Sequence, residues 1–422
     1  MRAGRCRLTA ALVLAGFAAT VLAAGAAGAL EIAHSELSGR IAAEGRWFYQ
    51  DNAHAGQDSY NSGFVVEPKL YVEDDEGRSL TVKPFFRYDA GDAGRTHADL
   101  REGYFLIFGE AGEGEWELRL GVDRVFWGVA ESRHLVDIVN QTDLVEHPNE
   151  ESKLGQPMAH VTWAGEWGAL ELFALTYHRE RTFPGRSGRL RSRFVVDDEH
   201  VSYESAAKEW HVDLAARYSR SAGLLDFGLT VFDGTSREAC LACVLPRLDK
   251  RGELLLVQHY EQIRQFGLDA QLTIESWLLK LEVIHRAGAS NGMGREQDYA
   301  AFVAGGEYTF NAVFDSNADL GLLVEWTYDG RGDDAPHVFN NEAFAAVRLG
   351  LNDVEGTQIT VSALWDLDHA TRSLGLELTR RLTDRWSLEV AGTFFVAVDK
   401  DDLNYYETRR DSFVEMGVTY HF

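Results

Sequence analysis

Hydrophobic and polar side chains alternate, residue by residue, along most of this chain. In the clearest run, 385–398, Trp386 and Leu388 lie on one side of an extended backbone, and Ser387 and Glu389 lie on the other. Successive side chains of a β-strand point to opposite faces, whereas a helix repeats every 3.6 residues, so this pattern predicts strands.

Eighteen such runs can be drawn along the chain. Many are longer than the five or six residues usual in soluble sheets and suit the roughly ten residues that a tilted strand needs to cross a bilayer. The pattern therefore predicts an all-β protein, a transmembrane antiparallel up-and-down β-barrel of about 18 strands, with 16 as the alternative. The runs are 37–50, 63–74, 78–90, 97–109, 115–127, 156–164, 167–179, 206–219, 222–234, 263–275, 277–288, 298–311, 318–329, 341–352, 355–368, 371–382, 385–398 and 408–422.

The connections between the runs alternate between short and long. Bacterial barrels have tight periplasmic turns and longer extracellular loops, so the two kinds should gather at opposite ends. Pro68 and Pro84 each remove a donor from a strand, which a bulge can accommodate. The short links are 74–78, 109–115, 164–167, 219–223, 275–277, 311–318, 352–356 and 382–385, and the long ones are 51–62, 128–155, 180–205, 233–262, 287–297, 330–340 and 399–407.

Tryptophan and tyrosine gather at the ends of the runs. Amphipathic rings prefer the headgroup level of a bilayer, so we interpret them as two aromatic girdles, although aromatic residues favour any strand. The residues are Trp47, Tyr49, Trp116, Trp127, Trp163, Trp167, Trp210, Trp277, Trp326, Tyr328, Trp386, Tyr405, Tyr406 and Tyr420.

Composition agrees with a single exported domain. No linker divides the chain, and its mean hydropathy of −0.23 suits a barrel in which half of the residues face a polar interior. The formal net charge of −25 argues against a nucleic-acid partner. Three early arginines, an apolar run over 8–24 and Ala27-Gly28-Ala29 predict a signal peptide over residues 1–29, followed by a barrel over 30–422.

The C-terminal segment 409–422 alternates in the same way and ends in Phe422. It resembles the last strand of Gram-negative outer-membrane β-barrels, in which a final Phe is the assembly signal. The resemblance implies a location in the bacterial outer membrane. The partners it implies are outer-membrane lipid and lipopolysaccharide, the barrel-assembly machinery and, as in general porins, other copies of the chain.

The segment 122–157 is one of the longest connections, and it carries an apolar run at Leu135, Val136, Ile138 and Val139. Water does not favour such a run, so we expect the loop 128–155 to fold inward. It resembles the constriction loop of general porins, which lies between the fifth and sixth strands.

The loop also carries a short sequence pattern. Arg124 to Gly128 (RVFWG), followed by Asp137, Asn140 and Asp143, is similar to an Arg-x-x-Trp-Gly pattern of porin-like barrels. The Asn-Pro usual in that pattern is Asn140-Gln141 here, which leaves subfamily and substrate open.

An inward loop would place charges opposite the wall of the barrel. Opposed acids and bases at a constriction select solutes by charge and dipole, and the alternative is that the same charges pair off as interior salt bridges. The candidate lining residues are Arg133, His134, Asp137, Asp143 and Glu146 of the loop and Arg87, Arg119, Asp123, Asp213, Arg217 and Arg348 of the strands.

The remaining chemistry is sparse. Cys240 and Cys243 are predicted to form a loop disulfide, because zinc would need two further ligands. Arg331-Gly332-Asp333 has the letters of an adhesion tripeptide, for which chance is the better explanation. No Gly-x-Ser-x-Gly or His-Glu-x-x-His motif indicates an enzyme, and we expect no cofactor and no metal.

The sequence therefore predicts a porin-like channel for passive diffusion of small hydrophilic solutes, constricted by the loop 128–155. A non-conducting barrel that serves adhesion, envelope structure or polymer export is the alternative. A barrel hydrolase is a more distant one.

Overall fold

The computed structural model describes residues 32–422, so the predicted signal peptide lies outside the described residues. Eighteen strands form the main sheet, and each pairs antiparallel with its two neighbours in the barrel. The strands are β1 (Ile32–Phe48), β2 (Tyr60–Asp74), β3 (Ser79–Asp89), β4 (His97–Ala111), β5 (Gly114–Asp123), β6 (Gln156–Gly165), β7 (Gly168–Leu175), β9 (Asp213–Ala222), β10 (Leu225–Thr235), β13 (Gln262–Ile274), β14 (Trp277–Ala287), β15 (Tyr299–Val313), β16 (Ala318–Asp329), β17 (Asn341–Gly350), β18 (Gln358–Asp366), β19 (Arg372–Arg381), β20 (Trp386–Ala397) and β21 (Phe413–His421).

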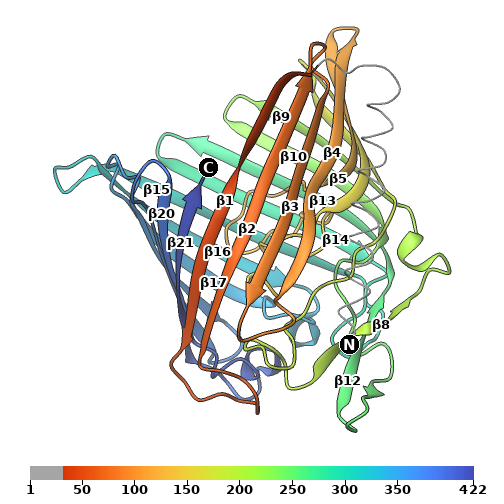
Figure 1. The fold of residues 1–422 in the computed structure, drawn as a ribbon, viewed down its shortest axis with the longest axis vertical. Coiled ribbons are helices and arrows are strands. Elements are labelled where there is room, and N and C mark those ends of the chain that lie inside the picture. Colours follow the sequence, from red (N-terminus) through yellow and green to blue (C-terminus); the bar gives the residue numbers. More distant parts are fainter. Residues whose placement is uncertain (1–31) are drawn as a thin grey trace.

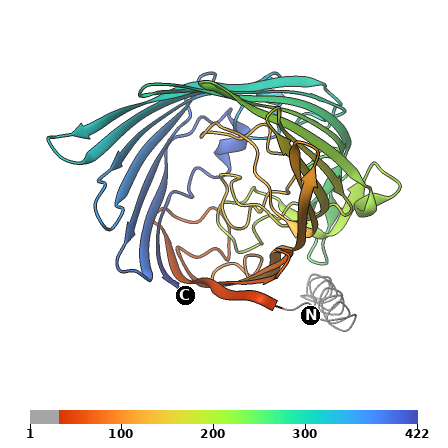
Figure 2. The same cartoon turned by 90° about the horizontal axis from the view of Figure 1, so that it is seen from above.

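The sheet closes on itself. Strand β1 pairs with β2 on one side and with β21 on the other, from Arg40 opposite His421 to Phe48 opposite Phe413. Viewed from above, the strands form a complete ring (Figure 2), and the strands slant across the wall in the side view (Figure 1). The predicted all-β barrel of eighteen strands is confirmed.

The alternation separates the two faces of the wall. In β16, Leu322, Val324 and Trp326 are exposed on the outside, whereas Glu325 and Thr327 are buried on the inside. Large apolar side chains are exposed in the same way on most other strands. An apolar outside and a polar inside are the faces of a barrel whose wall crosses a membrane.

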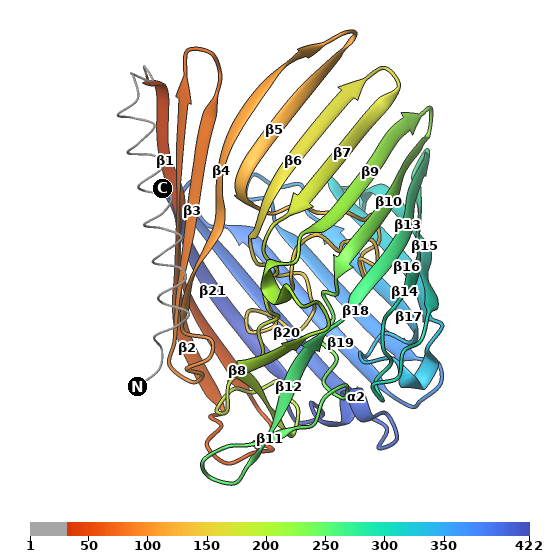
Figure 3. The same ribbon diagram turned by 90° about the vertical axis from the view of Figure 1, so that its right-hand side faces the viewer.

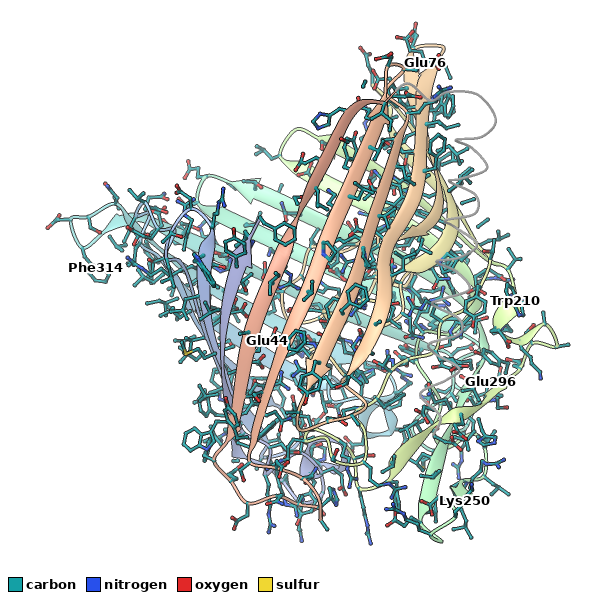
Figure 4. All side chains as sticks on the ribbon, viewed as in Figure 1. Glu44, Glu76, Trp210, Lys250, Glu296 and Phe314 are labelled. Carbon is teal, nitrogen blue, oxygen red and sulfur yellow. A yellow bond between two sulfur atoms is a disulfide. The ribbon has the colours of Figure 1, made fainter. Side chains whose placement is uncertain are left out.

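With one exception, the short link 367–371, the short links lie at one end of the barrel and the longer links at the other, as predicted. We call these the turn end and the loop end; Figure 4 labels Glu76 at the turn end and Lys250 at the loop end. The turn-end links are 75–78, 112–113, 166–167, 223–224, 275–276, 314–317, 351–357 and 382–385. The loop-end links are 49–59, 90–96, 124–155, 176–212, 236–261, 288–298, 330–340, 367–371 and 398–412.

Some strand boundaries differ from the prediction. The fifth strand stops at Asp123 and not at 127, because residues 124–127 turn into the barrel. The eighth barrel strand begins at Asp213, since Lys208–Trp210 forms the 3-10 helix η1 instead. The last strand begins at Phe413, after the short helix α2 (Leu403–Tyr406).

A second, three-stranded sheet was not predicted. It consists of β8 (Val195–Tyr203), β11 (Arg247–Leu248) and β12 (Leu254–Tyr260) and projects from the loop end (Figure 3). Strands β8 and β12 are parallel and join two loops that are far apart in sequence. The remaining short element is the 3-10 helix η2 (Gly332–Asp334) in the link between β16 and β17.

Proline and tryptophan mark local features of the wall. The register of β3 against β4 shifts at Pro84, as expected for a bulge. Trp163 and Trp386 are exposed near the turn end, and Trp47 and Trp326 near the loop end, in agreement with two girdles. Trp127 was wrongly placed among them, because it is buried inside the barrel.

Among residues 32–422, no helix is long and apolar enough to span a bilayer.

We expect Val324→Arg, on the outer face, to lower the free energy of unfolding in lipid by about 2–4 kcal/mol, the cost of Arg at the bilayer midplane. Ser362→Arg is the matched control, because Ser362 pairs with Ala346 on the inward face of its strand. Reversible unfolding in liposomes by urea, followed by tryptophan fluorescence, measures both. Equal losses would mean that the outer face does not contact hydrocarbon.

Candidate functional site

Residues 124–155, here called the infolded loop, lie inside the barrel, and Figure 2 shows coil segments within the ring of strands. Val136, Ile138 and Val139 are almost completely buried. They pack in one apolar cluster with side chains of the inner wall, such as Phe173 and Ile284. Each such burial contributes about 1.5–3 kcal/mol, so the apolar run fastens the loop to this part of the wall.

The wall that receives the loop is itself apolar on its inner face. The buried side chains that line it belong to β6, β7, β9, β10 and β13 to β15. They are Met158, Phe173, Leu175, Ala215, Phe232, Ile263, Ile284, Tyr299, Ala301 and Val303. The infolded loop therefore covers one side of the interior.

Two wall carboxylates hold the start of the loop. The backbone N–H groups of Val129 and Ala130 donate to Glu282 Oε1 at 2.8 and 2.9 Å. Those of Glu131 and Ser132 donate to Glu325 at 2.7–3.1 Å. A carboxylate surrounded by N–H donors forms charge-assisted hydrogen bonds, which fix the path of the backbone.

The side chain of Asn140 closes the base of the loop. Its Oδ1 accepts from the Val125 N–H at 2.9 Å, and its Nδ2 donates to the carbonyls of Asp123 and Leu154 at 3.0 and 2.9 Å. The amide thus joins the two ends of the loop. Within the Arg-x-x-Trp-Gly pattern, Trp127 packs edge-on against Phe173.

Four of the predicted lining residues form ion pairs between the infolded loop and the wall, and two of them, Glu146 and Arg87, pair with each other. Glu146 of the loop pairs with Arg87 of β3 at 2.7 Å, and Asp143 contacts Arg101 of β4 at 2.6 Å. Arg348 of β17 pairs with the loop residue Glu131 at 3.3 Å.

Other predicted residues pair with charges on the same element or elsewhere in the barrel, and not across the contact between loop and wall. Asp123 pairs with Arg119, four residues earlier on the same strand, and Asp137 pairs with Lys153 within the loop. Arg217 pairs with Asp269 and lies over the Trp127 ring, and Asp213 pairs with Arg237, which donates to the carbonyl of Val139. Most of these charges are paired, as in the alternative of interior salt bridges.

A buried ion cluster joins three loops, and the sequence analysis missed its centre. Glu238 pairs with Arg286 at 2.9 Å and with Arg331 at 3.2 Å. Arg133 of the infolded loop reaches His337 at 2.9 Å and lies 3.8 Å from Glu238. Burial acts to raise the pKa of Glu238, but Arg331 and Arg286 outweigh it, so that the pKa lies well below its usual value. The Arg331 side chain is completely buried, so the adhesion tripeptide does not present its arginine to solvent.

The remaining loop residue of the prediction, His134, lies edge-on against Phe126 at 4.7 Å between ring centres. Burial lowers its pKa, which favours the neutral ring. Neutral His134 therefore contributes packing to the loop.

Open space remains on the opposite side of the interior, between the infolded loop and β1 to β4. The cavity has a volume of about 420 Å³. Its lining combines bases and acids, namely Arg40, Glu67, Arg101, Glu102, Arg124, Glu146, Glu151 and Lys153, together with Phe85, Val125, Phe126 and Ser152. Ion pairs connect the elements around the cavity. Arg40 of β1 pairs with Glu67 of β2 at 2.7 Å, and Arg124 of the infolded loop pairs with Glu102 of β4 at 2.8 Å.

The loop between β7 and β9 crosses the mouth of the barrel at the loop end. Its residues 181–193, here called the strap, reach the loops beside β1 and β21 on the far side of the ring. Arg189 Nε donates to Asp411 Oδ1 at 2.6 Å, and both side chains are buried. The Gly185 N–H donates to Asp92 at 2.9 Å, and a Cβ on Gly185 would lie 2.3 Å from that carboxylate.

Cys240 and Cys243 form a disulfide in the structure, within the link between β10 and β13. The link is therefore constrained close to Glu238, the centre of the buried ion cluster.

Comparison with known proteins adds little beyond the fold. No family model matches the chain, and no curated protein matches it. Two engineered variants of the porin of Rhodopseudomonas blastica superimpose with TM-scores of 0.43 and 0.42 at 11% and 13% identity, over 92% of this chain and 100% of theirs. A structure described under asymmetric conductivity of engineered proteins gives 0.43 and 11% over the same shares. A porin-like barrel fits the closed sheet, and these likenesses are too distant to carry an argument about function.

The double variant Glu282→Gln with Glu325→Gln should release the infolded loop, because each charge-assisted hydrogen bond contributes about 1.5–3 kcal/mol. We expect trypsin to cleave the folded barrel faster at Arg133 or Lys153, as followed by mass spectrometry. Glu307→Gln is the control, since Glu307 faces inward and pairs with Arg348 without touching the loop backbone. Unchanged cleavage in the double variant would show that apolar packing alone holds the loop.

Proposed function

We propose that the chain is a porin-like channel of the bacterial outer membrane, through which small hydrophilic solutes diffuse passively. The closed sheet, the apolar outer face and the polar inner face support a membrane-spanning barrel. Eighteen strands enclose more space than wall side chains can fill, so loops decide how much of the interior stays open. Outer-membrane lipid, lipopolysaccharide and the barrel-assembly machinery are the proposed partners.

The observation that carries the proposal is the one-sided packing of the infolded loop. The loop covers the apolar inner wall from β6 to β15 and leaves the cavity of about 420 Å³ along β1 to β4. Polar and charged side chains line most of that cavity, as an aqueous path requires. The loop therefore narrows the interior without filling it.

The charges of the cavity suggest weak ion selectivity. Arg40, Arg101, Arg124 and Lys153 face Glu67, Glu102, Glu146 and Glu151, so bases and acids are equal in number. Opposite charges side by side orient dipoles more than they exclude ions of one sign. We therefore propose small neutral or zwitterionic solutes as the main substrate class.

Conductance across a planar lipid bilayer tests the channel. The refolded full-length chain should give discrete conductance steps with a reversal potential close to zero in a salt gradient. Deletion of residues 131–149 should enlarge the steps, because it removes the part of the loop that narrows the interior. Absence of steps in both proteins would overturn the proposal. Steps unchanged by the deletion would show that the loop is not the constriction.

One observation favours the second candidate, a non-conducting barrel. The strap crosses the mouth and is fixed by the buried ion pair of Arg189 with Asp411. Gln57 adds a hydrogen bond to the carbonyl of Gly188 at 2.7 Å. A strap held this firmly would hinder entry from the loop end, and the barrel would then serve envelope structure or adhesion.

The variant Arg189→Ala distinguishes an obstructing strap from a passive one. It leaves Asp411 buried without its ion partner, which costs about 3–5 kcal/mol and should release the strap. If the strap obstructs the mouth, the variant should conduct at least twofold more than the wild type in the same bilayer. Arg264→Ala, which removes an exposed pair with Asp233, is the control and should conduct normally. Equal conductance in all three proteins would show that the strap does not limit entry.

A further inference from the structure

His97, Asp143 and Glu146 converge where the infolded loop touches the wall. His97 is the first residue of β4, and the two acids belong to the loop. The His97 Nε2 atom lies 3.6 Å from Glu146 Oε1 and 3.9 Å from Asp143 Oδ2. One nitrogen and two carboxylate oxygens therefore meet, all within 4.8 Å of one another.

The hydrogen bond on the other side of the ring fixes the tautomer of a neutral His97. Its Nδ1 lies 2.9 Å from the carbonyl oxygen of Arg95, which can only accept, so Nδ1 carries the proton. The Nε2 lone pair then points toward the two carboxylates. A lone pair that faces two anions is repulsive unless a cation or a proton lies between them.

The Glu146 carboxyl is aimed into the same space. Only 9% of the residue is exposed, and its Oε2 pairs with Arg87. Its Oε1, like His97 Nε2, is buried and has no hydrogen-bond partner among the described residues. A buried carboxylate oxygen without a partner is costly, which is a second indication of a missing ligand between these groups.

We propose that His97, Asp143 and Glu146 bind a divalent transition-metal ion of the zinc class. Zinc binds imidazole nitrogen and carboxylate oxygen at about 2.0–2.2 Å, so tetrahedral ligand atoms lie roughly 3.3–3.5 Å apart. The separations from His97 Nε2, 3.6 and 3.9 Å, would have to shorten by up to about half an ångström, and the two carboxylate oxygens, which lie within 4.8 Å of each other, would have to approach as the ion binds. In a typical histidine ligand one ring nitrogen binds the metal, and the N–H of the other ring nitrogen donates to a group such as a backbone carbonyl.

The surroundings disfavour calcium or magnesium. Calcium takes six to eight oxygen ligands, often both oxygens of a carboxylate, and magnesium takes six oxygen ligands in near-ideal octahedral geometry. Here Arg87 occupies the second oxygen of Glu146, and Thr182 donates to the second oxygen of Asp143 at 2.6 Å. Arg101 also donates to Asp143 Oδ2, the proposed ligand atom, at 2.6 Å. Three ligand atoms and one open position match zinc better.

The proposed metal would fasten the infolded loop at a place that apolar packing does not reach. The apolar cluster holds the loop against β6 to β15, whereas His97 belongs to β4 beside the cavity. Glu146 and Arg101 also line that cavity. If the chain conducts as proposed above, zinc would therefore add positive charge beside the path and lower cation flow.

Zinc binding to the full-length barrel tests the site without reference to conductance. After removal of metals with a chelator, titration calorimetry with zinc chloride in detergent should find about one ion per chain. His97→Ala should weaken binding at least tenfold, and Glu146→Gln should do the same. Calcium should not compete at equal concentration.

Two matched variants serve as controls. His369→Ala removes a second histidine that, among the described residues, lies with two acids, Asp366 and Asp402. His160→Gln removes an inward histidine that pairs with a single carboxylate among the described residues, that of Glu171. Both should bind zinc as the wild type does. Zinc binding lost in His369→Ala and kept in His97→Ala would overturn the proposal.

A cobalt spectrum of the wild type covers the case in which His97→Ala does not fold. Cobalt(II) with this mixed nitrogen and oxygen set should give the intense visible bands of four-coordinate geometry, and zinc should displace it. Absence of binding, or only the weak bands of a hexa-aquo ion, would show that a proton and not a metal bridges His97 to the carboxylates. That result would overturn the proposal while leaving the channel untouched.

Discussion

The structure depends on one constraint, namely that every peptide group of a wall in hydrocarbon must have a hydrogen-bond partner within the protein. An unpaired backbone group in the bilayer core costs several kcal/mol, so a sheet can cross only if it has no edge. Pairing of β1 with β21 removes the last edge. Closure also separates the side chains into an outer set that meets lipid and an inner set that meets water or loops.

This constraint explains why the wall could be predicted from the sequence. Each strand must alternate over its whole length, so Val324 and Glu325 carry the signal whether or not their partners are known. All eighteen strands follow from it. The ends of strands are less certain, because the alternation continues into residues such as Trp127 that leave the wall for the interior. The small sheet was missed because β8 and β12 pair in parallel and are far apart in sequence.

The candidate site was predicted in outline and not in detail. The apolar run Leu135 to Val139 indicated an inward loop, because such residues need a cover. Nothing nearby in sequence distinguishes Glu282 or Glu325 from other inward acids, since their N–H partners lie more than 150 positions away. Glu238 was missed for the same reason: its partners Arg286, on β14, and Arg331, in the link after β16, are distant in sequence. The pair of Arg40 and Glu67 is different, because both residues occupy inward positions of the alternating pattern on β1 and β2. The sequence pattern could therefore have identified them as lining residues.

The asymmetry of the inner wall decides where an open path can lie. A loop of this length loses much conformational entropy when it enters the barrel, and only contacts with the wall can offset that loss. The inner faces of β6 to β15 offer apolar side chains such as Phe232 and Ile284, so the loop packs there. The inner faces of β1 to β4 offer charged groups such as Glu67 and Lys83, already paired at 3.1 Å, whose removal from water would be costly. The cavity therefore lies on the charged side, and the pattern of inward residues sets both the position of the loop and the position of the space beside it.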